Sequence, residues 1–214
     1  LMETEETQAE KICCYFESIA EAYILNNDLN LGEEYVEKAL YYAERYNLEY
    51  KKAKNFYLRG LIYMKAKDPT LAQQSILAAN VVFIKNNNYE EIIKSFVNLG
   101  KIALELKAYH SSYSYFQQAE KVYNDNSMVD DFLLGEIYYY MAYTNLKLEN
   151  LDKSINYSFL AKEKFKQLDN EKKYGKTLIM MAEQYSKSGN MKESVEYSQK
   201  ALSIFKKIDD KFYM

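Results

Sequence analysis

The chain has 214 residues, of which 48% are apolar, and its 28 basic and 31 acidic side chains give a formal net charge of −3. This near-neutral balance gives no reason to expect broad attraction to nucleic acid or to an anionic membrane. A membrane span is not expected either, because no apolar run approaches the ~18 residues that one needs, and the acidic N-terminus does not resemble a signal peptide.

Helical periodicity runs along the whole chain, and only one proline and six glycines are present to interrupt it. The pattern predicts about five helical hairpins, in units of roughly 4–48, 49–87, 88–127, 128–169 and 170–210. The paired helices are expected at 4–26 and 29–46, 50–67 and 69–85, 89–107 and 109–123, 131–149 and 151–168, and 171–188 and 191–208. Because no strand pattern and no long linker is found, residues 1–214 are expected to form a single all-α domain.

Side chains that can accept hydrogen bonds from free helix N–H groups occupy most of the predicted corners. They are Asp28, Asp68, Asn150 and Asn190 before the second helices, and Asn88 and Asn170 before two of the first helices. Ala108 is the exception. Pro69 fits the first position of a helix, where no N–H is needed, and Gly189 suits a helix end. Asn190 and Glu193 have the spacing of a capping box.

Small residues recur in one register along the chain. In the first helices they are Ala20, Gly60, Gly100, Ala142 and Ala182, which by subtraction are 40, 40, 42 and 40 residues apart. The same spacings relate Gly32, Ala72, Ser112, Ser154 and Ser194, and also Ala39, Ala79, Ala119, Ala161 and Ala201. Two extra residues fall near 124–131. This internal repeat of about 40 residues predicts a right-handed α-solenoid, because each hairpin can bury its apolar face only against its neighbours.

The spacing of small, aromatic and small residues resembles the tetratricopeptide repeat over nearly the whole chain. The strict motif has 34 residues, and these units are longer and lack its usual tryptophan and closing proline. Longer units in a chain rich in tyrosine, asparagine and lysine resemble the peptide-pheromone sensors of Gram-positive bacteria, the Rap, NprR and PlcR group. The resemblance implies a cytoplasmic sensor domain without a cofactor. Members that regulate transcription carry a helix-turn-helix DNA-binding domain upstream, which is not visible here. Since Met2 is not the first residue, we expect a fragment of a longer protein.

The first helices of such an array are expected to line a concave inner wall. Pairs spaced i, i+4 face it, namely Glu17/Glu21, Tyr57/Leu61, Val97/Lys101, Tyr139/Tyr143 and Ile179/Glu183. One turn earlier stand Lys54, Lys94 and Lys176, with Glu136 breaking the series. This wall suits a peptide with apolar side chains and a carboxylate. The candidate ligand-binding residues are Tyr57, Leu61, Lys94, Asn98, Lys101, Tyr139 and Tyr143. The alternative is that the tyrosines pack between hairpins and the lysines form a solvated face.

Catalytic and metal-binding patterns are weak. His110 and Ser111 lie at a corner without a third group to orient them, and Ser112 occupies a packing position, so His110 is interpreted as a surface residue. The adjacent pairs Asp130–Asp131 and Asp209–Asp210 are interpreted as caps or solvated charge. Cys13 and Cys14 cannot form a disulfide framework, and no metal-ligand spacing exists. Cys14 is expected to be small and partly buried. The chain is therefore predicted not to be an enzyme and to bind no metal.

Two functions remain. The first is a peptide- or protein-binding domain that switches a bacterial transcription regulator or signalling partner. The second is a passive scaffold for protein assembly. The carboxylate clamp of chaperone-binding tetratricopeptide domains is not expected, because its positions hold Glu17 and Tyr57. No nucleic acid is expected to bind this segment itself. A homodimer through the second helices, which carry Tyr41, Tyr42, Tyr113 and Tyr115, is left open.

Overall fold

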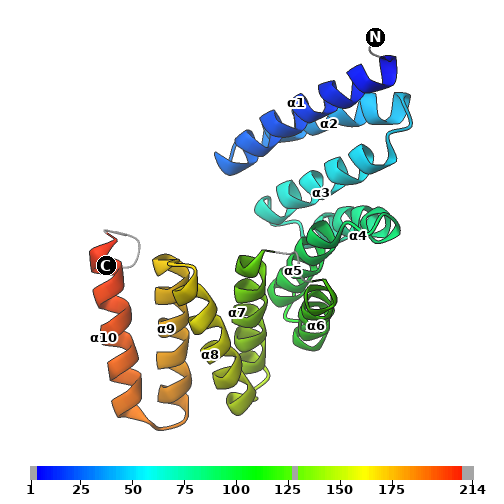
Figure 1. Ribbon diagram of the computed structural model, residues 1–214. Coiled ribbons are helices and arrows are strands. Elements are labelled where there is room, and N and C mark those ends of the chain that lie inside the picture. The colour runs from blue at the N-terminus through cyan, green and yellow to red at the C-terminus, as the bar shows by residue number, and fades with distance from the viewer. Residues whose placement is uncertain (1–3, 127–129, 209–214) are drawn as a thin grey trace. The chain divides into compact units, whose positions relative to one another are not determined.

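The computed structural model describes residues 4–126 and 130–208, and these residues form ten α-helices and no strand. The helices are α1 (Glu5–Leu25), α2 (Leu29–Arg45), α3 (Glu49–Lys65), α4 (Pro69–Lys85), α5 (Tyr89–Glu105), α6 (Tyr109–Asp125), α7 (Asp131–Lys147), α8 (Leu151–Gln167), α9 (Glu171–Lys187) and α10 (Met191–Lys207). Every boundary lies within two residues of its sequence prediction. The all-α hairpin fold is confirmed (Figure 1).

The chain forms two compact units that divide at Leu106 and Lys107. Unit 1 contains α1 to α5, in which each helix packs on the next and α1 also contacts α3. Unit 2 contains α6 to α10, with the same neighbour packing and a contact between α7 and α9. In each unit, therefore, successive first helices of the hairpins touch each other. We call α1, α3 and α5 the first-helix row of unit 1.

The repeating small residues lie where the helices of a hairpin approach most closely. Ala20, Ala39 and Ala72 are fully buried, and so are their counterparts along the chain, with at most 9% exposure at Ser194. A Cβ atom added to Gly60 would lie 2.5 Å from Cγ1 of Ile76 and 3.3 Å from the carbonyl oxygen of Ala72. The register read from the sequence is therefore set by steric contact between α3 and α4.

The corners share one backbone conformation. Where two helices are joined by three residues, the middle residue has a positive φ, as at Asn27 (62°) and Gly189 (80°). Within each unit, the following residue then donates its N–H back to the preceding helix, as Asp28 does to the Tyr23 carbonyl at 2.9 Å. The joint between α6 and α7 is longer, running from 126 to 130. The two extra residues of the repeat therefore lie where the sequence predicted them.

Side-chain capping follows the sequence prediction only in part. Asp28, Asp68 and Asn170 accept hydrogen bonds from helix N–H groups as expected. The prediction was wrong for three asparagines, since no side-chain cap hydrogen bond is made by Asn88, Asn150 or Asn190. The backbone hydrogen bonds that form the turn are present at these corners without a side-chain cap, so the turn does not depend on the side chain there.

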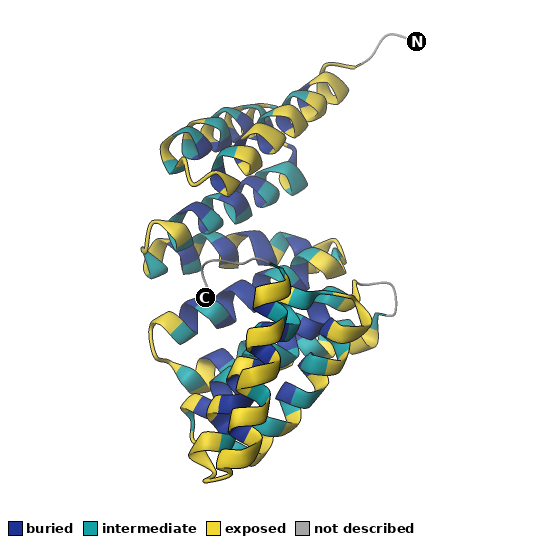
Figure 2. Ribbon diagram, turned by 90° about the vertical axis from the view of Figure 1, so that its left-hand side faces the viewer, coloured by how far each residue is buried: buried dark blue, intermediate teal, exposed yellow. Residues whose placement is uncertain are grey.

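The core is a series of buried stripes, one on each helix, which face the neighbouring helices (Figure 2). Equivalent positions of α4, α8 and α10 carry Phe83, Phe165 and Phe205, and each ring is at most 1% exposed. In unit 2 these rings leave no room for a side chain opposite them, because a Cβ on Gly135 or Gly175 would lie 2.8 Å from a ring atom. Large and small residues therefore alternate across each helix interface.

Candidate functional site

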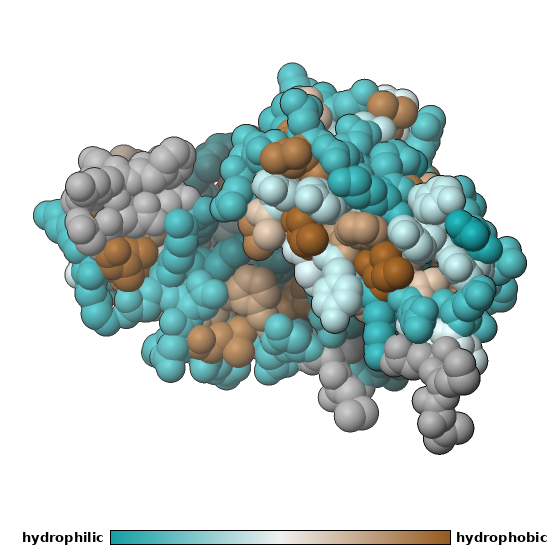
Figure 3. Space-filling view, turned by 90° about the horizontal axis from the view of Figure 1, so that it is seen from above, coloured by the Kyte–Doolittle hydropathy of each residue, from teal (hydrophilic) through white to brown (hydrophobic). Residues whose placement is uncertain are grey.

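A groove of about 350 Å³ opens on the first-helix row of unit 1, and we call it the unit-1 groove. Apolar atoms form its floor, contributed by Ile24, Tyr57, Leu58, Leu61 and Phe83. On the face seen in Figure 3, apolar side chains form patches among hydrophilic ones. Exposure of single apolar residues therefore does not mark a site on that face, and the unit-1 groove is defined by its lining.

Tyr57 is held in place by contacts on two sides. The Asn98 amide Nδ2 donates a hydrogen bond to the Tyr57 hydroxyl at 2.8 Å, and the Tyr57 ring packs edge-on against Phe83 with centroids 6.3 Å apart. Asn98 is 8% exposed. Its amide therefore positions the ring of a predicted site residue. Leu61 packs partly against the core of the first hairpin, which fixes the other end of the floor.

The rim of the unit-1 groove is charged and carries both signs. Lys54 and Lys94 line it together with Glu21 and Glu91. The Lys54 ammonium lies 3.8 Å from the Glu21 carboxylate, and Lys94 pairs with the exposed Glu90 one turn away on α5. Both lysine side chains remain more than one third exposed. The lysine edge expected from the sequence is present, but acidic groups accompany it.

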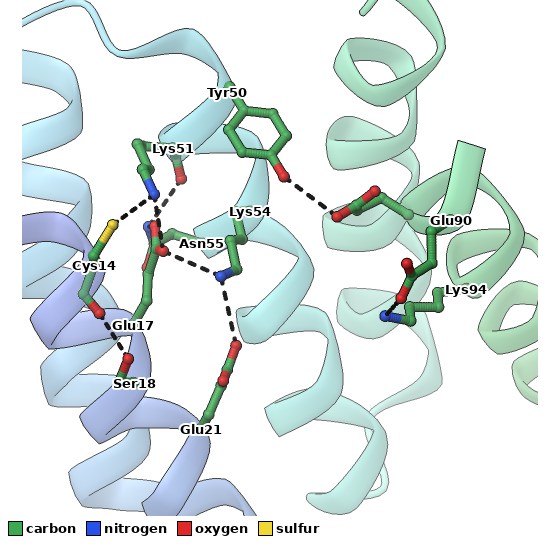
Figure 4. Close-up of polar contacts among 11 residues, drawn as sticks. Cys14, Glu17, Ser18, Glu21, Tyr50, Lys51, Lys54, Asn55, Glu90 and Lys94 are labelled. Carbon is green, nitrogen blue, oxygen red and sulfur yellow. Dashed lines mark hydrogen bonds and ion pairs between the residues drawn. The ribbon is translucent and has the colours of Figure 1, made fainter. Parts of the chain in front are cut away.

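A buried carboxylate lies behind this rim. Glu17 is 1% exposed and receives a hydrogen bond from Asn55 at 3.0 Å, while the ammonium groups of Lys51 and Lys54 lie 3.4 and 3.3 Å away (Figure 4). The sequence placed Glu17 on the open wall beside the packing stripe, and that prediction was wrong, as it was for Val97, which is 2% exposed. Contact between α1 and α3 buries this side of both helices.

Glu91 was not identified from the sequence. Its carboxylate accepts a hydrogen bond from the Tyr50 hydroxyl at 3.3 Å, and burial together with this carboxylate raises the pKa of Tyr50. Within residues 4–126 and 130–208, no lysine or arginine nitrogen lies within 4 Å of it. The sequence nevertheless carries one indication. Cys14 and Lys51, which contact each other between α1 and α3, are 37 residues apart, and the repeat register places Lys54 and Glu91, also 37 residues apart, at the equivalent positions of α3 and α5.

The remaining predicted residues lie outside the unit-1 groove. Lys101 is partly buried on α5 and does not line it. Tyr139 and Tyr143 belong to unit 2, where both pack against a core cluster of Ala142, Leu146 and Met180. Tyr143 also has the Lys147 ammonium 5.0 Å from its ring centroid. The structure thus brings together Tyr57, Leu61, Lys94 and Asn98, and it places the two tyrosines together in the other unit.

The weaker candidates have structural roles. Cys13 is fully buried and Cys14 exposed, so the expectation that Cys14 is partly buried was wrong. Asp130 caps α7 and Asp131 pairs with Lys164 at 3.1 Å, while Asp209 and Asp210 lie outside the described residues. His110 is exposed, as expected. The described parts of the chain contain no group of acidic, histidine and cysteine side chains that could hold a metal ion. None of the described helices is long and apolar enough to span a membrane.

Comparison with known proteins supports the repeat. The tetratricopeptide-repeat model matches residues 175–207, which contain most of α9 and all of α10. No curated protein matches the chain by sequence. The expectation of a tetratricopeptide-type repeat is confirmed by this match and by the solved structures that share the fold.

Three solved structures illustrate the shared fold. A signal-transduction ATPase with numerous domains and a tetratricopeptide repeat sensor, from Pyrococcus horikoshii, is 20% identical with a TM-score of 0.82, over 94% of this chain and 31% of that protein. Aspartyl phosphate phosphatase F from Bacillus subtilis is 15% identical with a TM-score of 0.81, over 97% and 54%. The Rap conjugation gene regulator of plasmid pLS20, in complex with the Phr* peptide, is 16% identical with a TM-score of 0.74, over 100% and 58%. The chain spans less than two thirds of each.

Proposed function

We propose that this tetratricopeptide-repeat chain is a peptide-binding sensor domain of a bacterial cytosolic transcription regulator or signalling protein. The single observation that carries the proposal is the unit-1 groove, which combines an apolar floor of tyrosine, leucine and phenylalanine with two partly exposed lysines. A short peptide with apolar side chains would bury its side chains on the floor and its polar groups at the rim. The proposed binding residues are Tyr57, Leu61, Lys94 and Asn98, which the structure brings together at the unit-1 groove, whereas Lys101, Tyr139 and Tyr143, also expected from the sequence, lie outside it.

The solved structures lend this proposal support of a general kind. One neighbour carries a tetratricopeptide repeat sensor, and Rap structures contain the Phr* peptide or the competence and sporulation factor. In this chain, bound peptide would favour one packing of the first-helix row over another, and the effect would equal the difference in affinity for the two packings. Binding rather than catalysis would be the activity of the segment.

A passive scaffold is the second candidate, and the last hairpin favours it. A hollow of about 380 Å³ on α9 and α10 exposes Ile179 and Leu202, each at 44%. At the position equivalent to Leu202, Leu40 and Asn80 in unit 1 are 5% exposed. A protein partner covering this face would make the chain a structural link and would require no ligand in the unit-1 groove.

The test is thermal melting of the purified protein against short peptides encoded near its own gene. A peptide at about 100 times its dissociation constant adds about 2.7 kcal/mol to the free energy of unfolding, which raises the melting temperature. The shift is expected to disappear in the double variant Tyr57→Ala, Asn98→Ala, which removes the groove tyrosine and the amide that holds it. It should persist in Tyr41→Ala, a control tyrosine that is 58% exposed on α2. A folded protein that responds to no peptide would favour the scaffold.

A further inference from the structure

One pair of positions joins successive first helices, and the register makes its members comparable. Between α1 and α3 the pair is Cys14 and Lys51, whose sulfur and ammonium nitrogen lie 2.9 Å apart. Between α7 and α9 the pair is Glu136 and Lys173, which form an ion pair in contact. In both places the two side chains contact each other across the interface between the helices.

Between α3 and α5 the equivalent pair is Lys54 and Glu91, and here the contact is not made. Lys54 points back to Glu17 and Glu21, with its ammonium nitrogen 3.3 and 3.8 Å from their carboxylates (Figure 4). Glu91 instead accepts the Tyr50 hydroxyl at 3.3 Å. Both side chains line the unit-1 groove. Two side chains of opposite charge thus stand at the groove without neutralising each other.

The two charges differ in how well the protein satisfies them. Lys54 has a buried carboxylate within reach. Glu91 is partly buried and accepts a hydrogen bond from a neutral hydroxyl, with no lysine or arginine nitrogen within 4 Å in the described parts of the chain. A carboxylate in this position gains most from a ligand donor, and more from a charged donor than from a neutral one. The acidic side of the rim is therefore the side with unused binding capacity.

We infer that the unit-1 groove holds a dipolar ligand segment, with a cationic or N–H donor group at Glu91, an acceptor or carboxylate at Lys54, and an apolar side chain on the floor between them. This inference rests on the proposed function and adds the orientation in which the peptide segment would bind. The smallest probe that carries all three features is a zwitterionic apolar dipeptide. Its ammonium group belongs at the α5 side and its carboxylate at the side of α1 and α3.

The test uses leucyl-leucine with free termini, its N-acetyl form and its C-terminal amide, titrated into the full chain and followed by NMR chemical shifts. Free leucyl-leucine is expected to bind, and N-acetylation is expected to weaken binding about tenfold because Glu91 loses a charged donor. Amidation of the C-terminus is expected to weaken binding less, because the Lys54 ammonium keeps its ion pair with the Glu17 carboxylate when the ligand carboxylate is removed. In Glu91→Gln the free and acetylated forms should bind alike. Glu105→Gln on the same helix is the matched control, because Glu105 pairs with Lys67 and neither residue lines the groove.

Each result decides the inference. Equal affinity for the free and acetylated forms in the native protein would overturn it, and so would an equal loss in Glu105→Gln and Glu91→Gln. Failure of free leucyl-leucine to bind would also overturn it. Because the melting test of the proposed function uses longer peptides, a chain that responds to one of them but not to leucyl-leucine would lose only the dipolar site. A chain that responds to neither would lose both.

Discussion

Units 1 and 2 share the repeat register, but each buries a polar side chain at a different helix interface and satisfies it with different chemistry. Between α1 and α3, unit 1 buries the Glu17 carboxylate against two lysines and Asn55. Between α8 and α9, unit 2 buries Gln184, whose amide donates to the hydroxyls of Ser154 and Ser158 at 2.7 Å each. The first interface depends on charge and the second on neutral hydrogen bonds.

This difference shows which property the fold requires and which it leaves free. Both units keep small residues at the close approaches and a phenylalanine at the same core position, so these positions determine the packing. The position next to the packing stripe tolerates a glutamate in α1, a tyrosine in α3 and a valine in α5. That freedom is what allows the unit-1 groove to be charged at its rim.

The largest expected effect tests the shared part of the comparison. Phe83→Ala in unit 1 and Phe165→Ala in unit 2 should each lower the free energy of unfolding by about 3–5 kcal/mol, because each ring is fully buried at the same register position. Urea denaturation of each variant measures this. A loss below about 1 kcal/mol in either variant would contradict the shared register as the source of stability.

The next effect tests the difference between the units. Glu17→Gln should cost about 3 kcal/mol, the lower end of the range for breaking a buried ion pair, because Lys54 can turn toward solvent. In unit 2, Ser158→Ala should cost about 1 kcal/mol, since Gln184 keeps its bond to Ser154. Urea denaturation at low and high salt compares the two. If both variants lost the same amount, charge would not distinguish the interfaces.

A smaller effect is expected at the close approach of α3 and α4. Gly60→Ala should cost about 1–3 kcal/mol through overpacking, because its Cβ would lie 2.5 Å from the buried Ile76 side chain. Gly32→Ala is the matched control, since its Cβ would lie 3.2 Å from Ile24 and calls for a smaller adjustment. Thermal melting of both variants gives the order. An equally stable Gly60→Ala protein would mean that Ile76 can move aside.

The smallest effect concerns the neighbouring thiols of unit 1. Burial raises the pKa of Cys13 to about 11, and its thiol lies 3.4 Å from the Ala39 carbonyl. Because the pKa of Cys13 is higher in the folded than in the unfolded chain, the stability that the buried neutral thiol contributes is fully present below pH ~9 and is lost as pH rises through about 11. Iodoacetamide at pH 8 should therefore modify the exposed Cys14 and spare Cys13, as mass spectrometry of the peptides would show. Equal labelling of both in the folded protein would refute this.

The fold was predictable from the sequence because its determinants are local and repeat. Gly60 and Ala72 sit at fixed offsets from equivalent residues in the other hairpins, and Pro69 marks a helix start. The expectation was wrong for Asn150 and Asn190 although their corners have the same backbone hydrogen bonds as that of Asn170, which does cap, so a suitable residue type does not guarantee the contact.

For the candidate site, the sequence predicted only which helix face carries it. Helical spacing placed Tyr57, Leu61 and Lys94 together, and these residues do line the unit-1 groove. Spacing within one helix does not reveal how deeply the next helix covers a residue, which is why Glu17 was expected to be open and is buried. Spacing also does not reveal which side chain a charged group pairs with. Only the structure shows that Lys54 pairs with Glu17 and that Glu91 accepts a hydrogen bond from Tyr50.

The central claim is that a peptide binds the first-helix row of unit 1, and hydrogen exchange tests it most directly. Amide exchange of the whole chain would be compared with and without the peptide that raises its melting temperature. The account predicts added protection concentrated in α3 around Tyr57 and Leu61 and in α5 around Glu91 and Lys94. Protection confined to α9 and α10, or no change in α3 and α5, would contradict it.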